Sequence, residues 1–219
     1  MANSILIIGG GASGLMCAIG LAKKGKRVVV LEKNERVGKK LLATGNGKCN
    51  LTNINTTYKD YNTTFIKDIL EEFTPQRIID EFAQLGLLTK VDSEGRVYPY
   101  SESAGNALNV LLRRLDEYGA QIVCNALVEK VTHDNGKWKA VTSKGEFIGD
   151  SLVFACGSNA TSGIDSLGIM AKLGHKVTPF RYAIAPLLCD DVRGANGVRA
   201  KAYAGIYING EFIMGERGE

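Results

Sequence analysis

The chain has 219 residues, of which 45% are hydrophobic and 23% are charged, and its formal net charge at pH 7 is +4. This balance is typical of a globular protein and argues against a disordered, collagen-like or coiled-coil chain. The net charge is too small to indicate nucleic-acid binding by itself, and no apolar run approaches the ~20 residues of a membrane-spanning helix.

The cysteines and histidines argue against a disulfide framework and a metal centre. The five cysteines form no C-x-x-C pair and lie mostly in apolar segments, as is typical of reduced thiols. The sequence holds two histidines, too few for a metal site with several histidine ligands. Residues 1–4 lack the basic region and the cleavage site of a secretory signal, so we expect a cytoplasmic protein.

Buried strands alternate with a helix at the start of the chain. Apolar runs over residues 4–9 and 27–32 indicate strands, and apolar residues at helical spacing over 12–24 indicate a helix between them. Such a unit is almost always right-handed, and its two strands are parallel. Residues 34–55 lack periodicity and are rich in Gly, Asn, Thr and Lys, so we expect a long loop, functional or disordered, with one turn of helix.

Further elements follow in an α/β order. Periodicity and capping residues predict helices over 65–73, 75–85, 103–118 and 163–173, a hairpin over 87–100 and a strand over 121–124. Three strands are predicted to form a meander, over 127–133, 138–143 and 146–154. We therefore predict an α/β, doubly wound (Rossmann-like) domain over residues 1–189 with a β-meander insertion, and the start of a second β-rich domain over 190–219.

Three glycines follow the first strand in the pattern G-x-G-x-x-G. Gly9 permits the tight turn, Gly11 lets a pyrophosphate approach the backbone, and Gly14 lets the helix pack close to the sheet. The free N–H groups and the positive end of the helix would bind the phosphates. Glu32 lies 18 residues after Gly14, where a carboxylate can accept hydrogen bonds from a ribose diol and repel a 2′-phosphate. The strand, the helix and the acid together predict a dinucleotide site.

The segment after Glu32 favours FAD over NAD as the dinucleotide. None of the eight tyrosines has a lysine four positions on, so the Tyr-x-x-x-Lys pair of short-chain NAD-type reductases is absent. Residues 33–50 are loop-like and rich in backbone donors and cations, as expected of a segment that crosses a pyrophosphate toward a flavin ring. Residues 21–48 hold nine Lys or Arg and two Glu, a local charge of +7 beside the glycine motif. An NAD-only dehydrogenase remains the alternative enzyme.

Residues 38–53 carry a resemblance to a known family. They read Gly-Lys-Lys-Leu-Leu-Ala-Thr-Gly-Asn-Gly-Lys-Cys-Asn-Leu-Thr-Asn. This segment resembles the hallmark of a bacterial NAD(P)/FAD-dependent flavoprotein family that includes aminoacetone oxidases and flavoproteins linked to bile-acid dehydroxylation. Residues 95–99, 152–157, 173–175 and 185–187 resemble further landmarks of that family. Its chains are roughly twice as long, so we expect this sequence to correspond to their N-terminal half.

The glycine motif and the resemblance together imply a set of FAD-binding residues. Glu32 would bind the adenosine ribose, Lys39 and Lys40 would neutralise phosphate, and the backbone of Val128 would pair with adenine. The loop residues 44–50 would approach the flavin, with Cys49 read as a buried inert thiol. The predicted site consists of Gly9, Gly11, Ala12, Ser13, Gly14, Glu32, Lys33, Lys39, Lys40, Thr44, Gly45, Asn46, Gly47, Asn50, Val128, Ala155 and Gly157.

The function implied is that of an FAD-dependent oxidoreductase. The flavin would move two electrons between NAD(P)H or oxygen and a small organic substrate, while the protein orients and tunes it. No side chain of this sequence is assigned as the acid, base or nucleophile. A nucleotide-binding fragment that is catalytically incomplete is a second alternative. We expect a small-molecule substrate and neither a nucleic-acid nor a membrane partner, and the oligomeric state is left open.

Overall fold

The computed structural model describes residues 3–157, 166–178 and 202–218. The chain divides into two compact units, Met1–Val177 and Thr178–Glu219, which are described separately below. The domain boundary predicted at residue 190 lies outside the described residues. Within the described segments, no helix is long and apolar enough to cross a membrane.

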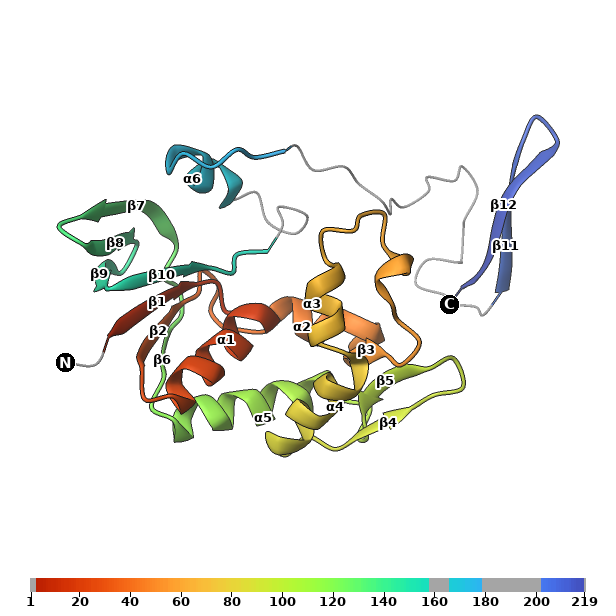
Figure 1. Cartoon of the computed structure of the whole chain (residues 1–219), viewed down its shortest axis with the longest axis horizontal. Helices are drawn as coiled ribbons and strands as arrows, with labels where there is room; N and C mark the ends of the chain where they lie inside the picture. Colours follow the sequence, from red (N-terminus) through yellow and green to blue (C-terminus); the bar gives the residue numbers. More distant parts are fainter. Residues whose placement is uncertain (1–2, 158–165, 179–201, 219) are drawn as a thin grey trace. The chain divides into compact units, whose positions relative to one another are not determined.

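A four-stranded parallel sheet forms the centre of the first unit (Figure 1). It consists of β1 (Ser4–Ile8), β2 (Arg27–Leu31), β6 (Gln121–Val123) and β10 (Ser151–Phe154), in the order β10-β1-β2-β6. The two central strands consist almost entirely of Ile, Leu and Val, and nearly all of their residues are buried. Such continuous apolar runs are typical of parallel strands that are covered on both faces.

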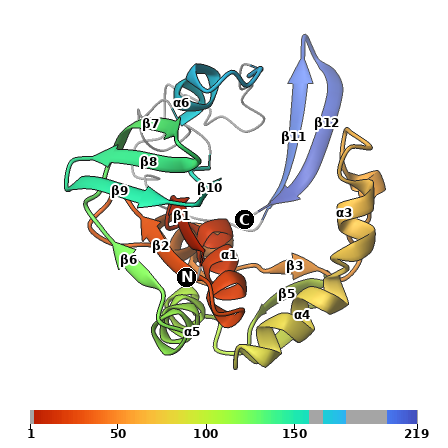
Figure 2. The same cartoon turned by 60° about the vertical axis from the view of Figure 1, so that its left-hand side comes forward.

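Two helices cover one face of this sheet (Figure 2). They are α1 (Ala12–Lys23) and α5 (Ala104–Glu117), and both turn an apolar stripe toward the alternating strand residues Ile5 and Ile7. The α5 helix begins where it was predicted, because the hydroxyl of Ser103 accepts a hydrogen bond from the third residue of the helix. The predicted Rossmann-like arrangement of strand, helix and parallel strand is therefore present.

The predicted meander is present as β7 (Val128–Asp134), β8 (Lys137–Thr142) and β9 (Gly145–Gly149). The strand predicted over 146–154 is wrong in one respect, because it divides into β9 of the meander and β10 of the parallel sheet. The break lies at Asp150, whose carboxylate accepts a hydrogen bond from the backbone N–H of Ser4 at 2.7 Å. A contact between residues so distant in sequence leaves no trace in local periodicity.

The meander covers the second face of the parallel sheet (Figure 2). Leu6 and Ile8 of β1 point to this side and pack in one cluster with Ala140 of β8. The helix α6 (Ser166–Lys172) contributes Ile169 to the same cluster. Helices thus cover one face and an antiparallel sheet covers most of the other.

The segment between β2 and α5 is more ordered than its composition predicts. Instead of one long loop, residues 34–55 contain a helix, a 3-10 turn and a short strand. This strand pairs with the predicted hairpin and makes a three-stranded antiparallel sheet, in the order β3-β5-β4. The elements are α2 (Lys39–Ala43), η1 (Thr44–Gly47), β3 (Thr52–Asn53), η2 (Tyr58–Asp60), α3 (Lys67–Glu72), α4 (Pro75–Gln84), β4 (Thr89–Val91) and β5 (Arg96–Pro99).

The described part of the second unit is an antiparallel hairpin of β11 (Ala202–Ile208) and β12 (Glu211–Gly218). Its turn residues Asn209 and Gly210 have φ of 52° and 84°, as the Asn-Gly pair of a tight hairpin turn requires. Tyr207 and Phe212 pack edge to face across the strands, with their ring centroids 5.3 Å apart.

Candidate cofactor site

Three strands of the parallel sheet end together, and the glycine motif begins at this edge. Ile8 at the end of β1 lies in register with Leu31 of β2 and Phe154 of β10. The N–H of Gly9 donates to the carbonyl of Leu31, and the N–H of Ala155 donates to the carbonyl of Ile8, both at 2.8 Å. Because the chain leaves β1 toward β2 on one side while β10 lies on the other, this edge is the kind of switch point where parallel sheets bind ligands.

The three glycines of the motif meet different surroundings. Gly9 has φ of +111°, and a Cβ there would overlap the carbonyl oxygen of Ala155. A Cβ on Gly14 would overlap the carbonyl oxygen of Gly9. A Cβ on Gly11, by contrast, would meet no atom within 4 Å. Gly9 and Gly14 are therefore required by the packing of the chain on itself, whereas Gly11 borders open space that a ligand can fill.

The first turn of α1 presents donors to this open space. Gly11 is the N-cap and offers no side-chain hydrogen bond, and the first turn contains no acidic residue. Ala12 and Ser13 are exposed, while the next residue, Gly14, is buried. Since the first N–H groups of a helix have no partner inside it, they are suited to bind an anion such as a phosphate.

Glu32 lies beside the glycine turn and is buried, with 7% of its surface exposed. One of its carboxylate oxygens accepts a hydrogen bond from the N–H of Gly10 at 2.7 Å. The other accepts from the backbone N–H and the side-chain amide of Asn34, at 2.9 and 2.5 Å. A carboxylate offers about four acceptor positions, so this one has room for a further donor such as a ribose hydroxyl.

Sequence reasoning missed the residues that hold Glu32 in place. Gly10 occupies a variable position of the motif, yet its N–H donates to Glu32 and its carbonyl accepts a hydrogen bond from the N–H of Gly38 at 2.8 Å. A Cβ on Gly10 would overlap the side chain of Val37. The motif does not include Asn34 either. The run of three glycines at residues 9–11 is the one signal in the sequence, and it concerns Gly10 alone.

Lys40 and Gly157 lie close together across the edge of the sheet. The ammonium nitrogen of Lys40 lies 3.3 Å from the position that a Cβ on Gly157 would take. Lys40 belongs to α2 and Gly157 follows β10, so the fold brings together two predicted site residues that are far apart in sequence. Lys39 is exposed, and Lys33 is half-buried.

The predicted flavin loop, residues 44–50, adopts an unusual backbone. Gly45, Asn46, Gly47 and Cys49 all have φ between 54° and 84°, the left-handed region that few residues other than Gly and Asn adopt easily. Two internal hydrogen bonds close the loop, one of them from the N–H of Cys49 to the carbonyl of Thr44 at 3.0 Å. Gly45 is confined as well, because a Cβ there would lie 2.8 Å from the backbone nitrogen of Asn50.

The loop exposes its polar residues and buries its thiol. Thr44, Asn46, Gly47 and Asn50 are exposed, whereas Cys49 retains 1% of its surface. Burial raises the pKa of the Cys49 thiol, and a hydrogen bond with Thr44 opposes this shift. The thiolate is therefore disfavoured, in agreement with the interpretation of Cys49 as an inert thiol.

Two ion pairs join the flavin loop to the neighbouring hairpin. The carboxylate of Glu102 lies 2.9 Å from the ammonium of Lys48 in the loop and 2.6 Å from that of Lys90 in β4. Hydrogen bonds from Lys90 and Lys48 lower the pKa of Glu102 to about 2. All three side chains are partly exposed, so the pairs position the loop more than they stabilise the fold.

Val128 lies at the start of β7 and is buried in the cluster between the parallel sheet and the meander. Two residues before it, the N–H of Ala126 donates to the backbone carbonyl of Glu32 at 2.8 Å. The ladder between β7 and β8 is irregular between Val128 and Lys130. The fold therefore brings Val128, predicted to contact adenine, to the same end of the site as Glu32.

A family model described as "HI0933-like protein Rossmann domain" matches residues 3–216. The chain belongs to this family. The match confirms the resemblance found in the loop motif, and it agrees with the parallel sheet and the glycine turn of the structure.

Two curated relatives of this HI0933-like chain carry different names. It is 33% identical to a 3-dehydro-bile acid delta(4,6)-reductase of Clostridium scindens, over 99% of the chain and 56% of the relative. It is 30% identical to a ribosomal RNA dihydrouridine synthase of Haemophilus influenzae, over 82% of the chain and 44% of the relative. The chain thus spans about half the length of these relatives. Because one name includes RNA, the expectation that nucleic acid is no partner does not extend to the family.

Among solved structures, THI4 of Thermovibrio ammonificans resembles the HI0933-like chain with a TM-score of 0.52. The two share 18% sequence identity over 80% of this chain and 64% of the other. At this identity the likeness shows the Rossmann-like fold alone.

Proposed function

We propose that this chain binds FAD and provides the cofactor site of an oxidoreductase that adds hydrogen to a carbon–carbon double bond. The single observation that carries the proposal is the buried carboxylate of Glu32, held 2.7 Å from the N–H of Gly10 beside the uncapped start of α1. This arrangement matches the sugar and phosphate parts of an adenine dinucleotide.

The chain's own residues would divide the binding between them. The N–H groups of Ala12 and Ser13 would bind the pyrophosphate, and the open space beside Gly11 would admit it. Glu32 would accept hydrogen bonds from the ribose diol and exclude a 2′-phosphate by repulsion. Lys40 would place a positive charge near the phosphates. When bound, FAD supplies a ring that accepts and releases two electrons.

The choice of reaction comes from the names of the two relatives described above. The name delta(4,6)-reductase describes hydrogen addition to carbon–carbon double bonds of a 3-dehydro bile acid, and the name dihydrouridine synthase describes a uridine with two added hydrogens. In both substrates the double bond is conjugated to a carbonyl group. We extend this shared chemistry to the present chain, with NAD(P)H as the proposed electron donor.

RNA is a second candidate substrate. The ribosomal RNA named for the Haemophilus influenzae relative favours it, as does the local charge of +7 over residues 21–48. If these cations bind an RNA backbone, affinity for a short RNA should fall steeply with added salt, since bound counterions are released on binding. A salt-independent or undetectable interaction would remove this candidate.

The cofactor proposal is tested by releasing and identifying the bound molecule. We expect the purified chain to show visible flavin absorption and to release FAD, detected by mass spectrometry. Glu32→Gln should weaken FAD binding by about tenfold or more, which corresponds to about 1.4 kcal/mol. Glu35→Gln is the matched control, because Glu35 is exposed and follows in the same segment.

Two measurements keep the test decisive. Thermal unfolding of the unloaded variants separates lost affinity from lost stability. Release of NAD with no visible absorption would overturn the FAD assignment in favour of an NAD-only dehydrogenase. Equal FAD affinity in Glu32→Gln and Glu35→Gln would remove Glu32 from the proposed site.

A further inference from the structure

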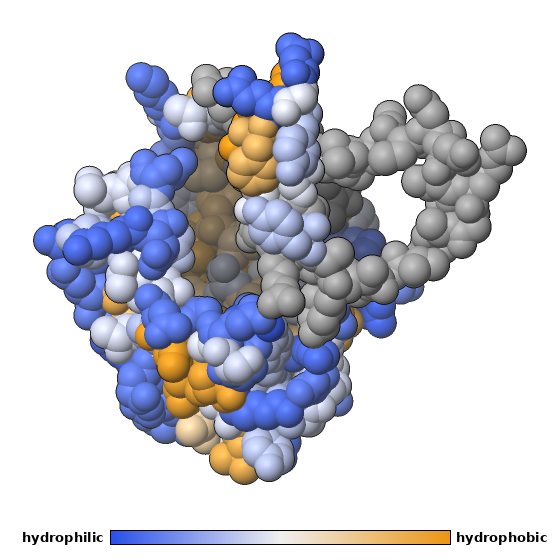
Figure 3. All heavy atoms as spheres, turned by 90° about the vertical axis from the view of Figure 1, so that its right-hand side faces the viewer, coloured by the Kyte–Doolittle hydropathy of each residue, from blue (hydrophilic) through white to orange (hydrophobic). Residues whose placement is uncertain are grey.

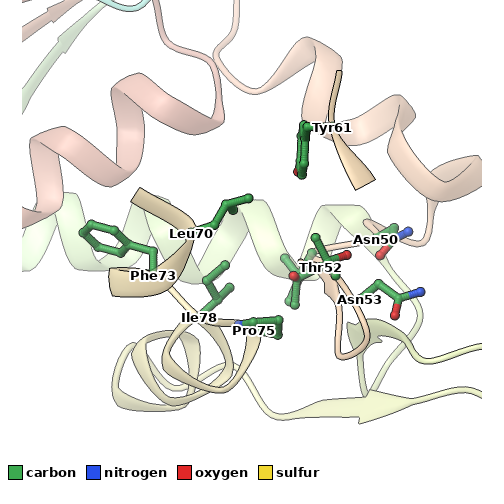
Figure 4. A pocket seen from close by; sticks show the side chains of 10 residues that line it. Asn50, Thr52, Asn53, Tyr61, Leu70, Phe73, Pro75 and Ile78 are labelled. Carbon is green, nitrogen blue, oxygen red and sulfur yellow. The ribbon is translucent and has the colours of Figure 1, made fainter. Parts of the chain in front are cut away.

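A cavity of about 390 Å³ lies next to the flavin loop, in the first unit. The chain from Asn50 to Asn53 forms one side, and residues of α3 and α4 form another (Figure 4). Tyr61 stands across the cavity from these elements (Figure 4). Its volume lies within the range of sites that bind small molecules, about 300–1,000 Å³.

The two ends of this cavity differ in chemistry. Asn50 and Thr52 lie at one end, and no hydrogen bond within the described residues engages either side chain. Leu70, Pro75 and Ile78 line the other end. None of the lining residues is charged. The cavity therefore suits a molecule with a hydrogen-bonding oxygen at one end and an apolar body, and it offers no charged partner that would offset the burial of a carboxylate or a phosphate.

Phe73 lines the apolar end of the cavity and is also partly exposed. Phe65, Ile69 and Phe73, from α3 and its flanks, expose 83%, 51% and 44% of their surfaces. Figure 3 shows apolar residues reaching the surface in patches between hydrophilic ones. Exposed aromatic residues beside a cavity are a common feature of sites that bind apolar ligands.

We propose that this cavity binds the reducible substrate, an uncharged and largely apolar molecule with a carbonyl oxygen. The carbonyl lies at the Asn50 and Thr52 end, where an amide and a hydroxyl can donate to it. The inference rests on the proposed function, since a reducible substrate requires a flavin nearby. Asn50 belongs to both the cavity and the predicted flavin loop, so a flavin bound at that loop would lie next to the cavity. A carbonyl held at this end is directed toward the loop that would carry the flavin.

Binding of progesterone, an uncharged steroid with a carbonyl conjugated to a double bond, tests this proposal. We expect saturable binding to the purified chain, measured by ligand-observed NMR without added FAD. Ile78→Glu should weaken binding by about tenfold or more, because a carboxylate then faces an apolar ligand. Thr52→Val, which removes one donor at nearly constant volume, should weaken it by about threefold to tenfold.

Ile79→Glu is the matched control. Ile79 follows in the same helix and is half-buried, as Ile78 is, but it does not line the cavity. We expect progesterone affinity to change by less than about twofold in this variant, because residue 79 does not line the cavity. Circular dichroism and thermal unfolding of both variants establish that each remains folded.

The outcomes separate this proposal from the cofactor proposal. FAD affinity is titrated independently in the same proteins and should be unchanged by Ile78→Glu. If the parent chain does not bind FAD, the proposed function is wrong, whether or not progesterone binds. Absent progesterone binding, or equal weakening by Ile78→Glu and Ile79→Glu, would overturn the cavity proposal. Binding of uridine in place of progesterone, weakened by Ile78→Glu, would overturn it as well and assign the cavity to a nucleobase.

Discussion

The glycine turn and the flavin loop both expose backbone to the candidate site, but they are held in opposite ways. In the glycine turn, Gly10 is buried and both of its backbone groups are engaged, one of them by the buried Glu32. The flavin loop is exposed at most of its positions, and partly exposed ion pairs through Glu102 join it to the hairpin. The glycine turn is thus fixed by buried contacts, whereas the flavin loop combines one buried side chain, Cys49, with exposed side chains and surface ion pairs.

This difference determines what a mutation can report. Around the glycine turn, the groups that would bind the cofactor also hold the fold together, so lost binding and lost stability are easily confused. In the flavin loop the exposed side chains can be changed with little effect on the core. Experiments on the first region therefore need a stability measurement beside every affinity measurement.

Gly14→Ala and Gly11→Ala should separate the two roles within the glycine motif most sharply. A Cβ on Gly14 would overlap the carbonyl oxygen of Gly9, so we expect the free energy of unfolding to fall by about 3 kcal/mol. Gly11 has φ of −81° and open space around it, so Gly11→Ala should change stability by less than about 1 kcal/mol. Urea unfolding of both variants without FAD measures this.

For Gly11, FAD affinity and not stability should change. If the pyrophosphate passes beside it, Gly11→Ala should weaken FAD binding by about tenfold although the protein remains stable. Unchanged FAD affinity in a stable Gly11→Ala protein would show that the open space is not the phosphate site.

Asn34→Ala should have an intermediate effect. It removes the amide that donates to the buried carboxylate of Glu32, but the two backbone donors remain. A hydrogen bond to a charged group contributes about 1.5–3 kcal/mol, so we expect the free energy of unfolding to fall by about 2 kcal/mol. Asn62→Ala is the control, because Asn62 is exposed. Equal unfolding midpoints for the two variants would show that Asn34 does not hold Glu32.

The sequence predicts the regular part of the fold well. The bounds of β1, α1, β2 and α5 agree with the predicted ranges within about two residues, since apolar periodicity and caps determine these elements locally. The proximity of Glu32 to the glycine turn also follows from the spacing of one β-α-β unit. These features depend on residues that are near one another in the chain.

The rest of the fold depends on contacts between distant residues. The strand β3 exists because Thr52 pairs with Val97, and β9 separates from β10 because Asp150 binds Ser4. The roles of Gly10 and Asn34 become visible when Glu32 and the glycine turn are placed together. Local composition predicts a loop over residues 34–55. Glycines with left-handed φ and the pairing of Thr52 with Val97 give this segment a regular structure instead.

Glu102→Gln should have the smallest effect and the clearest dependence on pH. The pKa of Glu102 is lowered from 4.5 to about 2, so its ion pairs contribute their full stability above pH 4.5 and lose it as the pH falls toward about 2. The side chains are exposed to water, so we expect the variant to melt at most about 2 °C lower than the parent at pH 7. This difference should shrink as the pH is lowered through about 4 to about 3, and also with added salt. Glu129→Gln, at an exposed glutamate of β7, is the matched control. A difference in melting temperature that stays constant from pH 7 to about pH 3 would mean that Glu102 acts through packing, and the flavin loop would then be held more like the glycine turn than its surface contacts indicate.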